Sequence, residues 1–597
     1  MCGIFGYISH PSLKLRNGKQ TGDAAKIIFD GLKRLEYRGY DSWGIAVKDQ
    51  GKITLEKHVG RIGQAKVNLP KSSLGIGHTR WATHGGVTVA NAHPHLDCTG
   101  QIAVVHNGIV ENFQDLKNEL TRKGHKFISE TDTEVIPHLI EEFLKKEGFA
   151  SAVRDTFNRL KGLNAIVVTS AVSPEIIAAK NGSPLVAGIG KEEFFIASDA
   201  TGIVKHTKKV VFIEDNQMVV LGKSLKLVTL PKGQEIKPVF HDIDWKFEET
   251  KKGKFKHYFL KEIYEQPKVL ENVVLNQRQN LRKLAGLIDK ARGTFLLGCG
   301  TASYAALAGT YLFSKLAKKH INYSVGSEFS YLQDFVTPKT LVIPISQSGE
   351  TIDIVQPVQE VQKKGATIAA ITNVLGSTLY RQADYKFLLD AGPEKSVAGT
   401  KSFTSMISVL LLTAYILAGA EEDGKRLLLA AAKNLRSMFQ VKNINKIKRL
   451  ARKISRSEHM YLIGRGLSYP AAIEATLKIK EISYIHAEGF AGAELKHGVI
   501  ALIEKGTPCI IFAPNDETYE EIISNAEELK ARGGFIIGIG SKNNNVFNVW
   551  LETKDIKEAT IIPQVVYAQL LAYYLALERG VEDPDKPRNL AKSVTVK

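Results

Sequence analysis

The second residue of the chain is a cysteine, and its place makes it a candidate nucleophile. Removal of Met1 would leave Cys2 with a thiol and a free α-amine on the same residue. The amine is a built-in base, because its unperturbed pKa of about 7.7–8.0 lies close to the ~8.5 of a free thiol. A thiol paired with such a base is activated near neutral pH. The alternative is a buried or incidental thiol.

Three further motifs supply groups that hold an amino acid and stabilise an oxyanion. Arg80, in HTRWATHG, offers a planar fork of donors that suits a carboxylate. Asn107 and Gly108, in HNGIVEN, offer a side-chain amide and an approachable backbone N–H, a pair that can form an oxyanion hole. Asp132, in SETDTE, is a partner for an α-ammonium. The structural alternatives are a loop-stabilising arginine, a hairpin turn and a helix N-cap.

The motif SQSGET (346–351) is a candidate phosphate site. It follows an apolar run and precedes a helical one, so its backbone N–H groups lie at a helix N-terminus, where anions bind. The side chains that add hydroxyl or amide groups are Ser346, Gln347, Ser348 and Thr351. No Walker lysine follows, so a nucleotide P-loop is not expected. The alternative is a capping box, which Ser348 and Thr351 match poorly.

Two other segments are expected at strand ends near this motif. CGTASY contributes Thr301 and Ser303, and VAGTKSFT contributes backbone donors at Val397 and Ala398 together with Thr400. Ligands of open α/β sheets bind at the carboxyl ends of the strands. Helix caps and turns are the alternatives.

The C-terminal half holds titratable residues of a kind suited to proton transfer. Glu474, Lys478 and Glu481 fall at i, i+4 and i+7, one face of a helix, although an ordinary surface pair has the same spacing. His497, in ELKHG, is a candidate proton shuttle near pH 7, and a structural histidine is the alternative. Lys592, in the tail, would form a Schiff base if its pKa were lowered, and an exposed lysine is the alternative.

The elements that must position these residues differ between the two parts of the chain. About 240 N-terminal residues are β-rich with helices over 23–35, 113–123 and 133–146, and residues 12–22 look like a surface loop. The expected strands include 45–47, 75–76, 102–105, 165–169, 176–179, 194–197, 210–213 and 217–221. Beyond Glu262, apolar runs alternate with long helices, which predicts doubly wound parallel sheets.

This second part repeats internally. TFLLGCG and MYLIGRG lie 166 residues apart, LVIPISQSGET and CIIFAPNDET 167 apart at the shared Glu-Thr, and TIAAITN and FIIGIGS 168 apart. A nearly constant offset over three strand ends indicates a duplicated α/β domain. The second copy replaces SQSGET by APNDET, so we expect one phosphate site and not two.

Composition limits the class of protein. Apolar residues make up 44% and charged residues 24%, which excludes disordered, collagen-like and disulfide-scaffold classes. The cysteines Cys2, Cys98, Cys299 and Cys509 form no CxxC pair, which argues against a structural zinc site and fits a reducing compartment. The apolar stretch 405–420 is shorter than the ~20 residues of a membrane helix, and no signal peptide is evident. We therefore expect a cytoplasmic protein.

The formal net charge is +18, which raises the question of nucleic acid. Two segments are locally basic, 251–256 and 442–456, but neither interleaves aromatic residues as a single-strand platform would. A solvated helix face and a linker are the simpler interpretation. An anionic small-molecule substrate also suits this charge.

The N-terminal strings MCGIFGY, LEYRGYDS, HTRWATHG, NAHPH, HNGI and SETDTE resemble class II glutamine amidotransferases. The resemblance covers Cys2 to about Leu221 and implies an N-terminal-nucleophile hydrolase with a four-layer αββα fold that releases ammonia from glutamine. It implies Cys2 as nucleophile, its α-amine as base, and Asn107 and Gly108 as the oxyanion hole. The glutamine-binding residues that it implies are Arg80, Trp81, Thr83, His84 and Asp132. Trp81 resembles a gating aromatic, with a core aromatic as the alternative.

The C-terminal strings SQSGET, KEISYIHAE, ELKHG and RNLAKSVTV resemble the tandem sugar-isomerase (SIS) domains of the isomerising glutamine–fructose-6-phosphate aminotransferase family, and EIYEQP (262–267) matches their entry. The expected domains are a glutaminase over 2–235, a linker over 236–261, SIS domains over 262–435 and 436–588, and a catalytic tail over 589–597. Two residues depart from the family: Ala302 stands where a sugar-contacting serine is common, and Gly399 stands where many members carry serine.

The resemblance implies conversion of D-fructose 6-phosphate and L-glutamine to D-glucosamine 6-phosphate and L-glutamate, with ammonia passing through an internal channel closed by the tail. Lys592 would form a Schiff base with C2, Glu481 would move a proton between C1 and C2, and Lys478 and Glu474 would assist. His497 would help to open the sugar ring from the neighbouring subunit of a homodimer. The phosphate would lie on Ser346, Gln347, Ser348 and Thr351. No metal or redox cofactor is implied.

Two rival hypotheses remain at this stage. One is a non-catalytic sugar-phosphate sensor, against which Cys2, Glu481 and Lys592 speak, since a sensor needs none of them. The other is an enzyme that only hydrolyses glutamine. Glutamate release that rises when fructose 6-phosphate is added would separate both rivals from the coupled enzyme. A nucleic-acid partner would show as salt-dependent retention on DNA.

Overall fold

The computed structural model describes residues 2–9, 23–243 and 251–594. The chain divides into two compact units. The first holds the residues up to Lys251 together with the segment from Ala591, and the second holds Lys252–Leu590.

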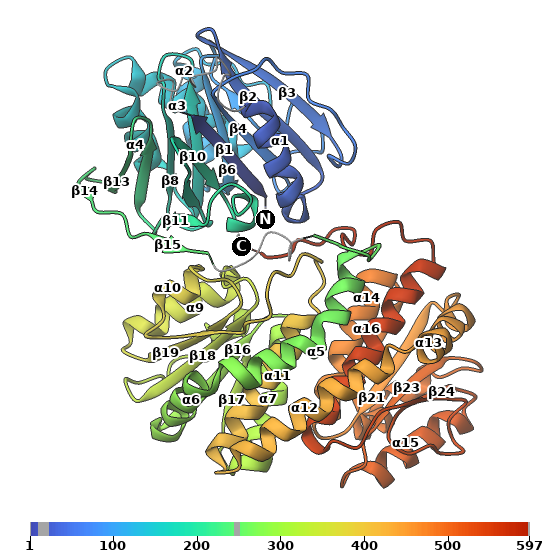
Figure 1. Ribbon diagram of the computed structural model, residues 1–597. Coiled ribbons are helices and arrows are strands. Elements are labelled where there is room, and N and C mark those ends of the chain that lie inside the picture. The colour runs from blue at the N-terminus through green and yellow to red at the C-terminus, as the bar shows by residue number, and fades with distance from the viewer. Residues whose placement is uncertain (1, 10–22, 244–250, 595–597) are drawn as a thin grey trace. The chain divides into compact units, whose positions relative to one another are not determined.

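The first unit contains two antiparallel sheets (Figure 1). In spatial order, the strands of the larger sheet are β15 (His241–Asp242), β11 (Lys209–Phe212), β9 (Val186–Ile189), β10 (Glu193–Ala197), β1 (Gly3–Ser9), β4 (Leu74–Arg80), β2 (Ser42–Asp49) and β3 (Lys52–Val59). Those of the smaller sheet are β14 (Glu235–Ile236), β13 (Leu225–Thr229), β12 (Gln217–Leu221), β8 (Ile176–Lys180), β7 (Asn164–Ser170), β6 (Ile102–Gly108) and β5 (His95–Leu96). Each predicted strand coincides with one of these elements.

Alternating side chains place these sheets between two helical layers. In β6, Ile102 and Val104 pack in one core with α2 (Phe113–Arg122), α3 (Val135–Leu144) and α4 (Phe149–Arg159). Ala103 and Val105, on the other face, join the core between the two sheets. The outer face of the larger sheet packs on α1 (Ala24–Leu35). The period of two along each strand thus buries both faces, and the four-layer αββα prediction is confirmed.

The second unit contains two five-stranded parallel sheets with the same strand order. The first is β17 (Asn322–Val325), β16 (Gly293–Gly298), β18 (Thr340–Ser346), β19 (Thr367–Thr372) and β20 (Tyr385–Leu388). The second is β22 (His486–Ala491), β21 (His459–Gly464), β23 (Pro508–Ala513), β24 (Phe535–Gly540) and β25 (Val549–Glu552). The shared order confirms the duplication predicted from the constant sequence offset.

Helices cover both faces of these sheets, as in a doubly wound fold (Figure 1). They include α5 (Tyr258–Asn276), α6 (Arg278–Lys290), α7 (Thr301–Ala317), α9 (Ile352–Lys363), α11 (Lys401–Leu417), α12 (Glu421–Met438), α13 (Val441–Ile454), α14 (Ser468–Ser483), α15 (Tyr519–Ala531) and α16 (Ile561–Glu578). One continuous core joins α5, α7, α11, α14 and α16 with one face of each sheet. The two repeats therefore share their interior.

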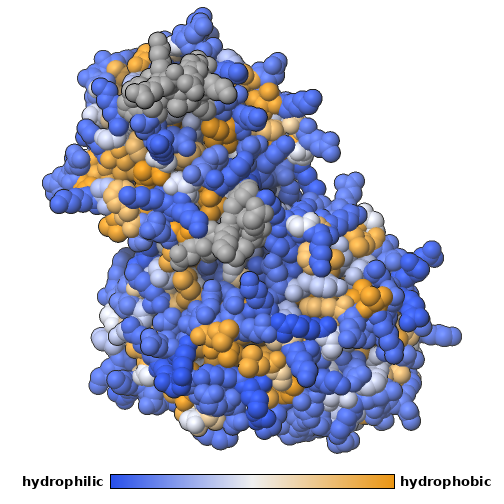
Figure 2. Space-filling view, viewed as in Figure 1, coloured by the Kyte–Doolittle hydropathy of each residue, from blue (hydrophilic) through white to orange (hydrophobic). Residues whose placement is uncertain are grey.

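Two apolar helices lie inside the second unit. The predicted buried helix over 405–420 is α11, of which the first fifteen residues are buried. The segment Lys557–Glu578, which includes α16, is long and apolar enough to cross a membrane, but 94% of its apolar window is buried. It is a core helix, and sequence analysis did not single it out. The face shown in Figure 2 is correspondingly covered mostly by hydrophilic side chains.

Two predicted boundaries differ from the structure. The expected linker over 236–261 carries structure at both ends, because β15 pairs with β11 and α5 begins at Tyr258. Asp585 fixes that helix start by accepting the N–H groups of Tyr258 and Phe259 at 2.8 and 2.7 Å. The expected surface loop over 12–22 lies outside the described residues.

Candidate functional site

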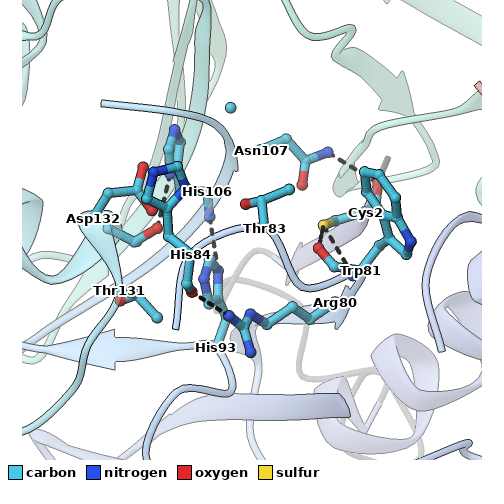
Figure 3. A pocket seen from close by; sticks show the side chains of 12 residues that line it. Cys2, Arg80, Trp81, Thr83, His84, His93, His106, Asn107, Thr131 and Asp132 are labelled. Atoms are coloured by element: carbon cyan, nitrogen blue, oxygen red, sulfur yellow. Dashed lines mark hydrogen bonds between the residues drawn. The ribbon is translucent and has the colours of Figure 1, made fainter. Parts of the chain in front are cut away.

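The N-terminal candidate residues meet in one pocket of the first unit. Cys2 directly precedes β1, Arg80 ends β4, and Asn107 and Gly108 end β6, so adjacent strand ends bring them together. The lining residues are Cys2, Arg80, Trp81, Thr83, His84, His93, His106, Asn107, Gly108, Thr131, Asp132 and Thr133. Figure 3 shows Cys2 and Asp132 at opposite ends of this pocket, with Thr83 between them. Every glutaminase residue predicted from the sequence is among them.

Hydrogen bonds fix Cys2 beside Asn107. The Trp81 N–H donates to the Cys2 Sγ at 3.2 Å, and Asn107 Nδ2 donates to the Cys2 carbonyl oxygen at 3.0 Å. The Asn107 amide is therefore a donor directed toward the nucleophile, as an oxyanion hole requires.

A buried histidine sets the orientation of that amide. His78 Nε2 lies 3.1 Å from both the His106 carbonyl oxygen and Asn107 Oδ1. Two oxygens face this nitrogen, so it carries the proton, and Asn107 must turn its NH₂ group toward Cys2. Burial lowers the pKa of His78 to about 3, which keeps the ring neutral. His78 is the first residue of HTRWATHG, but it is not among the site residues predicted from the sequence. Nothing in the sequence indicates that it lies behind Asn107.

Gly108 cannot be replaced without moving the backbone. Its φ is +141°, and an added Cβ would lie 2.3 Å from the Leu163 carbonyl oxygen. The absence of a side chain leaves its N–H approachable, as the oxyanion-hole prediction requires.

Arg80 and Asp132 are both buried, and each already has backbone partners. The Arg80 guanidinium donates to the carbonyl oxygens of His84, Gly85 and Gly86 at 2.5, 3.0 and 3.0 Å. The loop-stabilising role weighed for Arg80 is thus present, and the remaining N–H donors of its fork are still available for a carboxylate. Asp132 Oδ2 accepts the Val110 N–H at 2.7 Å, which leaves its other oxygen for an ammonium. The predicted N-cap is not formed, since Asp132 begins a 3₁₀ turn itself.

In the second unit, the structure brings the predicted carboxylates and the lysine into contact. α14 carries Glu474, Lys478 and Glu481, and Lys478 Nζ lies 3.6 Å from Glu474 Oε1 and 2.5 Å from Glu481 Oε2. Lys478 Nζ also donates to Thr301 Oγ1, from the first residue of α7, at 3.0 Å. Glu474 and Lys478 are fully buried, so the alternative of a surface ion pair is wrong.

The buried charges shift one another. Burial raises the pKa of Glu474 to about 8, with Lys478 acting in the opposite direction. Burial alone would lower the pKa of Lys478, but the two carboxylates outweigh it and raise that pKa. A helix of the second repeat thereby supplies an acid–base group to a strand end of the first repeat. This is the arrangement that proton transfer at a sugar carbon needs.

SQSGET forms the turn between β18 and α9. Ser346 Oγ accepts the Gly349 N–H at 3.0 Å, and Ser348 Oγ accepts the Glu350 N–H at 3.2 Å. Gly349 has a φ of +67°, and its Cβ would lie 2.0 Å from Ser377 Oγ. Thr351 is the N-cap of α9 without a side-chain capping bond, so the capping-box alternative is not formed. Gln347 directly follows Ser346, the last residue of β18.

Several predicted sugar-phosphate residues have structural partners. Ser303 is buried, and its hydroxyl pairs with the Tyr323 hydroxyl at 2.5 Å. Thr400 Oγ1 donates to Glu262 Oε2 at 3.0 Å, and its N–H donates to Glu394 Oε1 at 3.0 Å. Both hydroxyls thus have structural partners, although neither makes a side-chain capping bond: Ser303 bonds a residue of β17, and Thr400 is the N-cap of α11 without one.

The segment 394–402 is held by two buried carboxylates that sequence reasoning missed. Glu262 Oε1 accepts the N–H groups of Lys395 and Ser396 at 2.6 and 3.0 Å. Glu394 accepts both the N–H and the hydroxyl of Ser402. Val397 and Ala398 are buried within this segment. The signal for Glu262 was its place in EIYEQP, where a glutamate lies within the first turns of α5 among buried residues such as Phe259 and Ile263.

The remaining residues singled out from the sequence are Gly399, His497 and Lys592. Gly399 lies beside Thr301, since an added Cβ would stand 3.5 Å from Thr301 Oγ1. His497 is exposed at the end of a 3₁₀ segment after β22. Lys592 is partly buried in the C-terminal segment, which is grouped with the first unit. Their catalytic roles stay predictions.

The chain was compared with known proteins. A glutamine amidotransferase domain model matches residues 78–205, and a SIS domain model matches 287–416 and 453–579. Over the full length of both chains it is 43% identical to "Glutamine--fructose-6-phosphate aminotransferase [isomerizing]" of Pyrococcus horikoshii. It is 42% identical to the protein of the same name from Thermococcus kodakarensis, again over both full lengths.

A solved structure is similar to the second unit. The C-terminal domain of glucosamine-fructose-6-phosphate aminotransferase from Francisella tularensis is 33% identical, with a TM-score of 0.50, and the match covers 55% of this chain and 98% of that one. The full-length identities, together with one glutaminase and two SIS domains in order, show that the chain belongs to the isomerizing glutamine–fructose-6-phosphate aminotransferase family.

Proposed function

We propose that this enzyme transfers the amide nitrogen of L-glutamine to D-fructose 6-phosphate, yielding D-glucosamine 6-phosphate and L-glutamate. This is the first step toward activated N-acetylated amino sugars. The observation that carries the proposal is the buried cluster of Glu474, Lys478, Glu481 and Thr301, in a chain that also builds the Cys2 pocket. A glutaminase alone has no use for that cluster, and a sensor has no use for an N-terminal nucleophile beside an amide donor.

In the first unit, Cys2 attacks the glutamine amide carbon, and its α-amine accepts the thiol proton once Met1 is removed. Asn107 Nδ2 and the Gly108 N–H stabilise the oxyanion, while Arg80 and Asp132 bind the carboxylate and ammonium groups of the substrate. Ammonia leaves, and water releases glutamate from the thioester. Trp81, Thr83 and His84 complete the glutamine pocket.

In the second unit, the phosphate binds at the SQSGET turn, which lies at the N-terminus of α9 and carries the hydroxyls of Ser348 and Thr351. Glu481 moves a proton between C1 and C2, and Lys478 stabilises its carboxylate across 2.5 Å. Before that transfer, His497 opens the ring and Lys592 condenses with the C2 carbonyl with loss of water. Ammonia released from glutamine then displaces the Lys592 amine, so that the nitrogen remains on C2. The exposed position of His497 supports action on a neighbouring copy in a homodimer.

The proposed setting is the cytoplasm, with the two substrates as the partners and with nucleic acid playing no part. The buried apolar window of Lys557–Glu578 supports a protein outside the membrane.

Isotope transfer tests the proposal. Glutamine labelled with ¹⁵N in the amide, incubated with fructose 6-phosphate and enzyme, should place ¹⁵N in the amino sugar even when unlabelled ammonium is present in the solution. Label found only in free ammonium, with no amino sugar formed, would contradict amidotransfer.

A further inference from the structure

The helical layer of the first unit brings four potential metal ligands together outside the glutamine pocket. Cys98 follows β5 in a turn, His125 follows α2, and His138 and Glu141 lie one turn apart on α3. Their ligand atoms all lie within 4.8 Å of one another. The catalytic account uses none of the four.

We propose that these four residues bind one zinc ion. Around a tetrahedral zinc with bonds of about 2.0–2.3 Å, ligand atoms are separated by about 3.3–3.7 Å. The two Nδ1 atoms of His125 and His138 are 3.2 Å apart, and Cys98 Sγ lies 3.5 and 3.4 Å from them. Glu141 Oε2 lies 3.3 Å from His125 Nδ1 and 3.6 Å from His138 Nδ1. Five of the six edges of a tetrahedron thus have the lengths that zinc requires.

The same atoms are poorly matched as a plain hydrogen-bond cluster. The four ligand atoms gather within 4.8 Å of one another, and the carboxylate, which accepts the Cys98 N–H at 3.1 Å, has no proton to give at neutral pH. The thiol and the two Nδ1 atoms hold too few protons to bridge every short contact among them. A cation at the centre would satisfy all four at once, including the two buried histidines.

The surroundings of the histidines support this assignment. The other nitrogen of His125, Nε2, lies 3.0 Å from Glu142 Oε1. Metal-bound imidazoles commonly donate that second N–H to a carboxylate, which fixes the tautomer and leaves Nδ1 for the ion. The His138 ring is 1% exposed and packs edge-on against Phe127, with centroids 4.6 Å apart. Cys98 and Glu141 lie nearer the surface and leave a path for entry.

A site with four protein ligands is closed, so its role is structural and not catalytic. The ion would tie the turn after β5 to α3, whose preceding 3₁₀ turn begins with Asp132. Zinc would therefore stabilise the glutaminase unit close to the residue proposed to bind the glutamine ammonium. The absence of a CxxC pair led sequence analysis to argue against a structural zinc site. The proposed site instead joins one cysteine to two histidines and a glutamate that lie apart in the sequence.

Metal analysis of untagged, reduced protein tests the site. After incubation with excess zinc sulfate and desalting, we expect about one zinc per chain. Cobalt(II) in its place should give a thiolate-to-cobalt charge-transfer band together with tetrahedral d–d bands. A wild-type protein that retains neither ion after desalting would overturn the proposal, whatever the variants do.

Matched variants locate the ion. Cys98→Ser and His138→Ala should each lose most of the zinc, and Cys98→Ser should lose the charge-transfer band, whereas Cys299→Ser should keep both. Chelator should lower the melting temperature of the wild type and leave that of Cys98→Ser nearly unchanged. Full zinc and an unchanged cobalt spectrum in folded Cys98→Ser would contradict these ligands.

Discussion

At the scale of single residues, chemistry in the first unit depends on neutral histidines that orient polar groups. His78 holds the Asn107 amide toward Cys2, and His106 bridges Thr133 and Asn164 at 2.8 and 2.9 Å. Burial lowers the pKa of both rings, so neither is expected to become charged near pH 7. The amide proposed for the oxyanion hole is therefore already oriented before substrate binds.

Cys2→Ala tests the division of labour between the two centres. The variant should lose glutamine hydrolysis by more than about 10³-fold, because Cys2 is the one thiol among the described residues that line the pocket. It should still interconvert fructose 6-phosphate and glucose 6-phosphate. Glu481→Gln should show the reverse pattern. Loss of both activities in Cys2→Ala, in a protein that remains folded, would contradict two separate centres.

Glu474 predicts a pH dependence of stability. Its pKa is raised by burial to about 8, from about 4.3 in an unfolded chain, so folding favours the protonated acid. That contribution is complete below about pH 4 and is lost as pH rises toward about 8, on the order of 1 kcal/mol per pH unit.

Glu474→Gln mimics the protonated acid and removes this dependence. Melting temperatures of both proteins, measured from pH 5 to 8, should therefore diverge in favour of the variant as pH rises. A constant difference across that range would show that Glu474 does not titrate there.

At the scale of elements, the site of the second unit rests on α5 as much as on the strand ends. Glu262 accepts the N–H groups of Lys395 and Ser396 and the Thr400 hydroxyl, and so fixes the segment that ends beside Thr301. Glu262→Ala should destabilise this unit by about 3 kcal/mol or more, because it leaves buried donors unpaired.

The matched control is Glu271→Ala, further along the same helix. Its carboxylate is 33% exposed and pairs with Arg436, which is 52% exposed, so its loss should cost only about 0–1 kcal/mol. Chemical denaturation measures the free energy of unfolding of both variants and should show the large loss only in Glu262→Ala. The KM for the sugar phosphate is a second readout. Equal stability of the two would contradict the role given to Glu262.

The sequence allowed much of this element-scale picture to be predicted. The strands, the duplication and the α14 face followed from periodicity and offset, because those signals are local. The roles of Glu262 and His78 did not, because each depends on a partner far along the chain that only packing brings near. Glu394 was missed although its partners Thr400 and Ser402 lie close in the sequence. Ser303 and Thr400 were predicted to bind the ligand because their hydroxyls suit an anion. In the structure, those hydroxyls pair with Tyr323, Glu262 and Glu394 instead.

At the scale of the whole molecule, the two units have separate hydrophobic cores. Three apolar clusters lie among the described residues up to Ile243, and three others lie between Phe259 and Ala576. Calorimetry should therefore resolve two unfolding transitions. Glu262→Ala should lower only one of them, and Cys98→Ser only the other. A single transition shifted equally by both variants would contradict independent cores.

The central claim is that one chain couples glutamine hydrolysis to the synthesis of an amino sugar phosphate. The most direct test quantifies glutamate and glucosamine 6-phosphate together after purified enzyme, with Met1 removed, has acted on glutamine and fructose 6-phosphate. The account predicts equal amounts of the two products, and glutamate release that rises when the sugar phosphate is added. Glutamate formed without amino sugar, at a rate that fructose 6-phosphate does not change, would contradict it.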